Sequence, residues 1–148
     1  MKKTALILLA LATIAQAEFS RNPDTGVVTD DKTKLEWQDD YLSTADNDNS
    51  EDVYKKSWSS ALTYCKGLKL DGGGWRLPNI NELKSIIVDK VAPTIDGEFE
   101  KTVSNNYWSS TSYASGTYNA WFVNFNNGYT SYYNKGNSKY VRCVRAGQ

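Results

Sequence analysis

The sequence predicts an α+β domain with two helices and a mostly antiparallel sheet, and three observations support this prediction. Two segments between residues 58 and 87 carry apolar side chains at helical spacing. The last third of the chain alternates apolar and polar side chains in short runs that are separated by turn residues. A short hairpin pattern precedes both helical segments, so helices and strands are largely segregated along the chain.

The N-terminus has the features of a secretory signal peptide. Lys2 and Lys3 form a basic start, residues 5–14 are apolar, and Ala15-Gln16-Ala17 has the small residues of a cleavage site. We therefore expect residues 1–17 to be removed and residues 18–148 to form one domain in the periplasm, at the surface or in the medium of a bacterium. The alternative is a buried N-terminal helix. No later stretch is apolar enough to span a membrane.

The mature chain should begin with a hairpin. Residues 26–30 and 35–38 are strand-like runs on either side of the polar residues 31–34. Residues 39–56 are rich in Asp and Asn and show no periodicity, so we expect a surface loop there.

The first helix is predicted by apolar residues at i, i+3, i+4, i+7 and i+10 between Trp58 and Leu68, with Ser57 as its N-cap. This spacing places Cys65 on the apolar face. Asp71 and the glycines at 72–74 should end the helix, because they tolerate positive φ.

A second helix should follow Pro78. Asn79 can cap it, and Glu82 stands three residues later, as in a capping box. Pro93 should stop the helix or lie just beyond it. The apolar stripe of this helix consists of Ile80, Leu83, Ile86 and Ile87.

Four strands are expected in the remainder of the chain. Asn127-Gly128 is a strong hairpin signal that favours a type I′ turn. Residues 114–117 and 134–138 should form the other turns. The strands are predicted at residues 107–113, 118–126, 129–133 and 139–145.

The chain has two cysteines, Cys65 and Cys143. In an exported protein an even pair favours one disulfide, and two free buried thiols are the alternative.

Six segments stand in a fixed order along the chain, namely Leu35-Glu36-Trp37-Gln38, Trp58 through Ala61 with Cys65, Trp75-Arg76-Leu77-Pro78, Tyr107-Trp108-Ser109-Ser110-Thr111, Trp121-Phe122-Val123-Asn124-Phe125 and Val141-Arg142-Cys143-Val144-Arg145. Together they resemble the Lcl C-terminal domain family, which is related to C-type-lectin-like and formylglycine-generating-enzyme-like folds. The resemblance implies a C-type-lectin-like fold in which the N- and C-terminal strands close together and ligands bind at irregular loops. It also implies that Cys65 in the first helix bonds to Cys143 in the last strand. The family often has Thr-Gly-Leu where this chain has Thr33-Lys34-Leu35, which leaves the geometry of the first turn open.

The composition argues against an enzyme. The chain has no histidine, which removes the commonest general base and any Ser-His-Asp triad. Catalysis by carboxylates alone is left open. Without Lys2 and Lys3 the chain is weakly acidic, so we expect no general attraction to nucleic acid.

The acidic loop is a candidate calcium site, and we expect no other cofactor. Asp46, Asp48, Ser50 and Asp52 place oxygen-bearing side chains at alternate positions, and Ca²⁺ prefers such ligands. The EF-hand pattern fails, because Glu51 occupies the position where it requires glycine. The alternative is a solvated acidic loop without a metal.

Tyrosine and asparagine residues in or beside the C-terminal turns form the candidate ligand face. Tyrosine offers a large contact area at low entropic cost, and asparagine adds adaptable hydrogen bonds. We expect a binding or adhesion module for an extracellular ligand, with carbohydrate preferred over an envelope protein. The alternatives are that these tyrosines pack the sheet edges, or that the chain is a structural or assembly subunit of an envelope complex. The candidate residues are Tyr113, Tyr118, Asn127, Tyr129, Tyr132, Tyr133 and Asn134.

We expect structural roles for two further sets of residues, two arginines and the tryptophans. Arg76 and Arg142 should form ion pairs or hydrogen bonds to loop carbonyls. The tryptophans should lie in the core, namely Trp37, Trp58, Trp75, Trp108 and Trp121.

Overall fold

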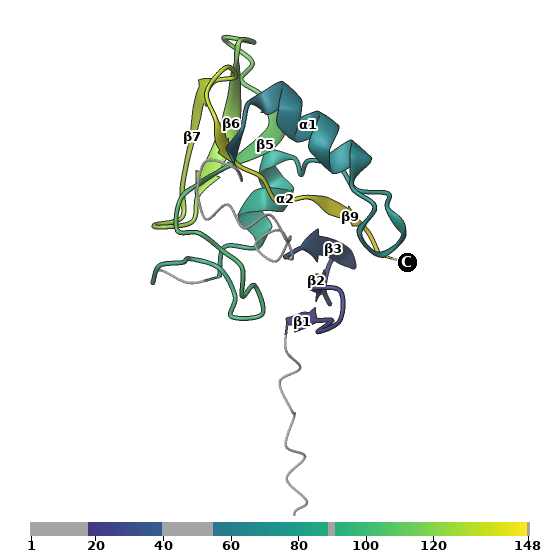
Figure 1. The fold of residues 1–148 in the computed structure, drawn as a ribbon. Helices are drawn as coiled ribbons and strands as arrows, with labels where there is room; N and C mark the ends of the chain where they lie inside the picture. The colour runs from purple at the N-terminus through teal and green to yellow at the C-terminus, as the bar shows by residue number, and fades with distance from the viewer. Residues whose placement is uncertain (1–17, 40–54, 89–90, 148) are drawn as a thin grey trace, which may run out of the picture.

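The computed structural model describes residues 18–39, 55–88 and 91–147. Its strands form a four-stranded and a five-stranded sheet; α2 lies between them and α1 runs along the five-stranded one (Figure 1). The α+β prediction, with two α-helices and mostly antiparallel pairing, is confirmed. The sequence pattern did not show that the strands divide between two sheets.

The four-stranded sheet joins the two ends of the described chain. Its order is β1-β2-β3-β9, and every neighbouring pair is antiparallel. The β2–β3 hairpin was predicted, whereas β1 was not, because three residues carry no detectable alternation. The last strand closes beside the third, with Trp37 opposite Val144, as the family resemblance implied. The strands are β1 (Phe19–Arg21), β2 (Val27–Asp30), β3 (Leu35–Gln38) and β9 (Val144–Ala146).

The β2–β3 turn contains Lys34, which stands where the family often has glycine. The Asp30 carboxylate accepts hydrogen bonds from the backbone N–H groups of Lys32 (2.8 Å) and Thr33 (3.1 Å). Lys34 then adopts φ +59°, in the left-handed region that favours glycine. Lys34 therefore has a backbone conformation that glycine adopts more readily, at the position where the family often has glycine.

Replacing Lys34 with glycine should raise the free energy of unfolding by about 0.5–1 kcal/mol. The left-handed conformation costs a side-chain-bearing residue about 1–2 kcal/mol, and the greater freedom of glycine in the unfolded chain offsets part of that gain. Urea unfolding measures the difference. Lys32→Gly is the matched control, because Lys32 has no positive φ and should lose stability. Equal effects of the two variants would contradict the interpretation.

The five-stranded sheet has the order β4-β8-β5-β6-β7. All its pairs are antiparallel except β5 and β8, which run parallel. The single strand predicted at residues 139–145 is wrong, because residues 141–143 cross from one sheet to the other and separate β8 from β9. The strands are β4 (Lys55–Lys56), β5 (Asn106–Ser112), β6 (Asn119–Asn124), β7 (Tyr129–Asn134) and β8 (Lys139–Tyr140).

Both predicted helices form with their predicted caps. Helix α1 (Trp58–Gly67) is capped by Ser57, and α2 (Ile80–Ser85) has the complete capping box of Asn79 and Glu82. Helix α1 ends before the glycine run. Residues Leu70–Gly72 form the short 3₁₀ helix η2, and the glycines at 72–74 have positive φ. No helix in the described part of the chain has the length and apolar character that crossing a bilayer requires.

Two apolar clusters hold these layers together. One lies around α2 and includes Leu83, Tyr107 and Phe125. The other lies under α1 and includes Trp108 and the disulfide between Cys65 and Cys143 (S–S 2.02 Å). The disulfide prediction is confirmed, and this bond ties the buried face of α1 to the segment that crosses between the sheets.

The β6–β7 turn differs from its prediction. A type I′ turn needs positive φ at both central residues, but in residues 125–128 only Gly128 has a positive φ (+72°). The turn instead spans four residues, and the Gly128 N–H donates to the Asn124 carbonyl (2.8 Å). The reason is tertiary: Phe125 is fully buried, and its backbone bonds to Thr94 and Asn105.

Candidate functional site

Three aromatic side chains from neighbouring strands form the clearest surface feature. The rings of Tyr113 and Tyr132 stack with centroids 3.7 Å apart and an interplanar angle of 6°. Trp121 meets both rings edge-on, at 5.7 Å from Tyr113 and 5.5 Å from Tyr132. We call Tyr113, Trp121 and Tyr132 the aromatic platform.

Strand register explains why the platform forms. Trp121 on β6 is paired with Tyr132 on β7, so their side chains stand on the same face, and Tyr113 follows the end of β5. Val123, which shares that face, belongs to the core around α2. Trp121 lies beyond this core and is only half-buried, so the prediction that it is a core residue is wrong. Trp58 is also half-buried, whereas the other three tryptophans are buried as predicted, namely Trp37, Trp75 and Trp108.

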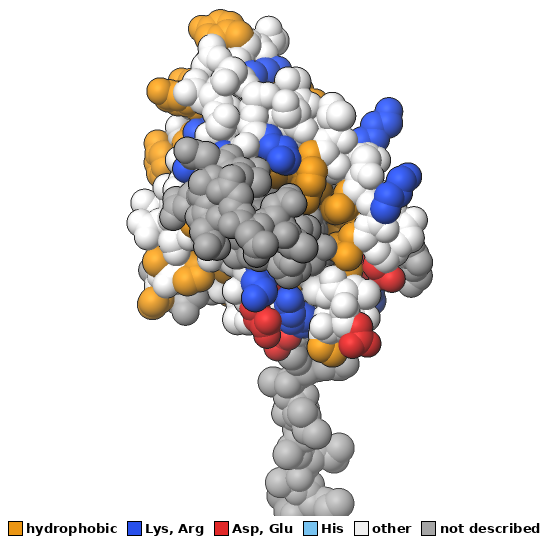
Figure 2. Space-filling model, viewed as in Figure 1, with side chains coloured by type: hydrophobic (Ala, Val, Ile, Leu, Met, Phe, Trp, Pro, Cys, Tyr) orange, Lys and Arg blue, Asp and Glu red, His pale blue; other side chains and the backbone are white. Residues whose placement is uncertain are grey.

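The platform reaches solvent along the β7 border of the molecule. Orange side chains stand along the border where Figure 1 places β7 and at the tip of the β5–β6 turn (Figure 2). Tyr132 is 40% exposed, and Tyr118 in the turn is 69% exposed. The pKa of Tyr132 is raised, first by its hydrogen bond with the Tyr113 side chain and also by the nearby phenols of Tyr118 and Tyr129.

Lys135 connects the β7–β8 loop to the β5–β6 turn at one end of the platform. Its Nζ donates to the Ser112 hydroxyl and to the Thr117 carbonyl, each at 2.7 Å. The same ammonium lies 4.0 Å from the centroid of the Trp58 ring, which is cation–π distance. The β7–β8 loop is thereby anchored to the β5–β6 turn, and this charge is already engaged by the protein.

The predicted ligand residues are only partly brought together. Tyr133 is paired with Ala120 and stands on the opposite face from Tyr132. Asn127 and Asn134 lie at opposite ends of β7, and both close turns through their side-chain oxygens. The Asn127 oxygen accepts from the Tyr129 N–H (3.0 Å), and the Asn134 oxygen accepts from the Gly136 N–H (2.8 Å).

Lys139 is a buried cation that sequence reasoning missed. Its Nζ lies 5.0 Å from the ring centroid of Trp108, 4.3 Å from that of Phe122 and 4.8 Å from that of Tyr133. Burial lowers the pKa of this lysine. Because Tyr133 forms part of this packing, we assign it a structural contribution.

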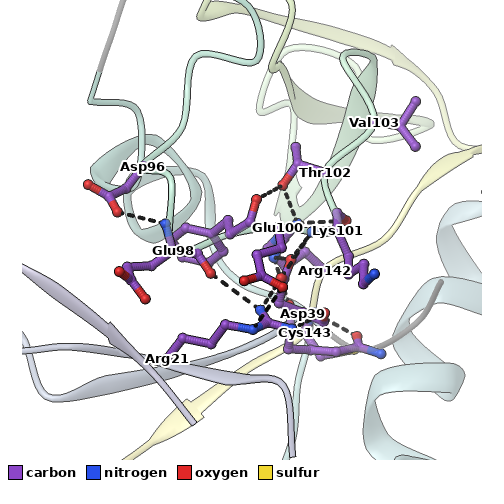
Figure 3. A network of polar contacts seen from close by, with 12 residues as sticks. Arg21, Asp39, Asp96, Glu98, Glu100, Lys101, Thr102, Val103, Arg142 and Cys143 are labelled. Atoms are coloured by element: carbon purple, nitrogen blue, oxygen red, sulfur yellow. Dashed lines mark hydrogen bonds and ion pairs between the residues drawn. The ribbon is translucent and has the colours of Figure 1, made fainter. Parts of the chain in front are cut away.

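The arginines named in the sequence have the structural role that was predicted for them. Arg21 and Arg142 both point at the buried carboxylate of Asp39 (Figure 3). Arg142 Nη1 lies 2.7 Å from Asp39 Oδ1, and the Lys101 N–H also donates to this carboxylate at 3.0 Å. Arg21 also lies 3.5 Å from the Glu100 carboxylate, so two carboxylates face the two arginines.

The other arginine of the prediction, Arg76, lies just before α2. Arg76 forms a bidentate bond with Glu82, and both contacts are 2.7 Å long. This pairing lowers the pKa of Glu82 and raises that of Arg76.

The candidate calcium ligands Asp46, Asp48, Ser50 and Asp52 lie outside the described residues. Within residues 18–39, 55–88 and 91–147, no three acidic, cysteine or histidine side chains are grouped to hold a metal ion.

Comparison with known proteins identifies one family that this chain matches. The sequence model of the Lcl C-terminal domain matches residues 26–145, which run from the start of the β2–β3 hairpin into β9. No curated protein matches the chain. Since the match covers most of the chain and both cysteines, the protein belongs to the Lcl C-terminal domain family.

Proposed function

We propose that this protein is an exported binding module that recognises an extracellular carbohydrate through the aromatic platform. The observation that carries the proposal is the stacked pair Tyr113–Tyr132 with Trp121 at its edge, partly open to solvent. The proposal narrows the predicted ligand face to one side of the β6–β7 hairpin.

The chemistry of the platform suits a sugar ring. A pyranose presents an apolar face of C–H groups and a rim of hydroxyls, so it can lie against an aromatic ring while phenol and amide groups bond its rim. Tyr118 and Asn119 stand in and beside the adjoining turn and can supply such polar contacts.

Export is supported by two features. The signal-like residues 1–17 direct secretion, and the Cys65–Cys143 disulfide is of the kind that persists in oxidising compartments. The C-type-lectin-like relation implied by the family resemblance stays a prediction.

The double variant Tyr118→Ala with Tyr132→Ala should weaken glycan binding by at least about tenfold, because it removes the exposed half of the stacked pair and a neighbouring phenol. A glycan array identifies the ligand, and calorimetry with that ligand measures the loss. The thermal midpoint should change little, because both side chains are exposed.

Tyr133→Ala is the control for the opposite face of β7, since it removes the contact with Lys139 and should lower the thermal midpoint while leaving binding intact. Unfolding of the double variant would show that these tyrosines are structural. If the wild type binds no glycan but retains one envelope protein, the module is an assembly subunit instead.

A further inference from the structure

Strand β7 is an unusual sheet edge. It stands at the end of the order β4-β8-β5-β6-β7, and its six residues, Tyr129–Asn134, include no charge, proline or glycine. Soluble proteins commonly protect an edge with short strands or with charges, especially lysine. The opposite edge of the same sheet follows that rule, because β4 consists of Lys55 and Lys56 alone.

The backbone of β7 presents hydrogen-bonding groups outward. The Lys135 N–H donates to the Tyr118 carbonyl, which continues the β6–β7 ladder by one pair beyond Asn119 and Asn134. Since bonded pairs alternate in an antiparallel ladder, the N–H and C=O groups of Ser131 point toward β6. Those of Thr130 and Tyr132 point away from β6, and no described backbone group bonds them.

We propose that a second copy of this chain adds its own β7 to this edge, antiparallel and about a two-fold axis perpendicular to the sheet. Such an axis keeps each residue on its own face and makes the interface self-complementary. The edge carries no charge, so two copies meet without repulsion between like charges.

The side chains select one register. Centring the axis on Ser131 places Tyr129 opposite Tyr133 of the second copy and Thr130 opposite Tyr132 of the second copy. Aromatic pairs and aromatic–β-branched pairs are the combinations that stabilise neighbouring strands. This register leaves out Asn134, whose carbonyl and side chain already accept hydrogen bonds from Asn137 and Gly136.

The proposed dimer does not depend on the proposed carbohydrate ligand. Pairing uses the backbone edge, and a perpendicular two-fold axis places both aromatic platforms on the same face of one continuous sheet. The dimer would therefore present two platforms side by side, and bivalent attachment to a repeating ligand would gain avidity.

Sedimentation equilibrium of the disulfide-bonded wild type should show a concentration-dependent dimer. Ser131→Lys and Ser131→Asp should each weaken the dimer at least about tenfold, because the axis places like charges directly opposite each other. An equimolar mixture of the two variants should restore it. Asn126→Lys carries the same charge in the exposed β6–β7 turn and should leave the dimer unchanged. A monomeric wild type, a dimer that survives either Ser131 variant, or no recovery on mixing would overturn the proposal.

Crosslinking tests the register without a charged variant. The two copies of residue 131 form a non-hydrogen-bonded pair with Cα atoms about 4.5 Å apart, within disulfide range. Ser131→Cys should form an intermolecular disulfide under mild oxidation, whereas Asn126→Cys should not. Failure of Ser131→Cys to crosslink, or equal crosslinking of both variants, would reject this interface. Glycan binding is measured separately, so either proposal can fail alone.

Discussion

Replacing Asp39 with alanine should lower the free energy of unfolding by about 3–5 kcal/mol, which is the range for removing one partner of a buried ion pair. The side chains of Asp39 and Arg142 are both fully buried. The substitution leaves the Arg142 guanidinium without its carboxylate, although its bonds to the Gln38 carbonyl (2.8 Å) and the Thr102 hydroxyl (2.7 Å) remain. It also removes the acceptor of the Lys101 N–H. Urea unfolding measures the loss.

Two comparisons separate the ion pair from a general effect of removing an acidic residue. Asp24→Ala removes an exposed carboxylate and should change stability by less than about 0.5 kcal/mol. Combining Asp39→Ala with Arg142→Met should cost less than the sum of the two single changes, because the buried charge is then absent. A loss of under 1 kcal/mol for Asp39→Ala, on the order of a surface pair, would refute this account.

Breaking the disulfide should lower stability by about 4 kcal/mol in the chain-entropy model. The bond joins residues 78 positions apart, and its loss frees a long loop in the unfolded chain. Reduction of the wild type tests the cross-link by itself, because both sulfur atoms stay in the buried cluster under α1. Intact mass after alkylation, with and without reduction, establishes that the bond was present.

The double variant Cys65→Ala with Cys143→Ala should lose more than reduction does, since it also leaves a cavity in that cluster. If reduction leaves the unfolding midpoint unchanged, the cross-link contributes nothing to stability, and packing alone holds α1 in place.

The helices could be predicted from the sequence because their signals are local. Ser57, Asn79 and Glu82 act within three residues along the chain, and the apolar spacing of α1 is the spacing of one helical face. The split of residues 139–145 could not be predicted in that way. The alternation continues through the crossing at residues 141–143, and the break depends on Asp39 and Cys65, which are distant in sequence.

The candidate site could likewise be predicted only in part from the sequence. Composition located the tyrosine-rich hairpin but could not assign its faces, because a face depends on the register between β6 and β7. Trp121 was assigned to the core because it alternates with Val123 and Phe125. The structure puts those two residues in the core around α2 and leaves Trp121 outside it.

The pairing of β3 with β9 has a consequence for the order of folding. Contacts between residues far apart in sequence form slowly, because the chain between them must be closed first. During synthesis β1, β2 and β3 emerge long before Val144–Ala146. The four-stranded sheet therefore lacks β9 until nearly the whole chain is available. The fold is thus completed only after synthesis is almost finished. Late completion of the fold suits the export proposed above, which requires a chain that is still extended.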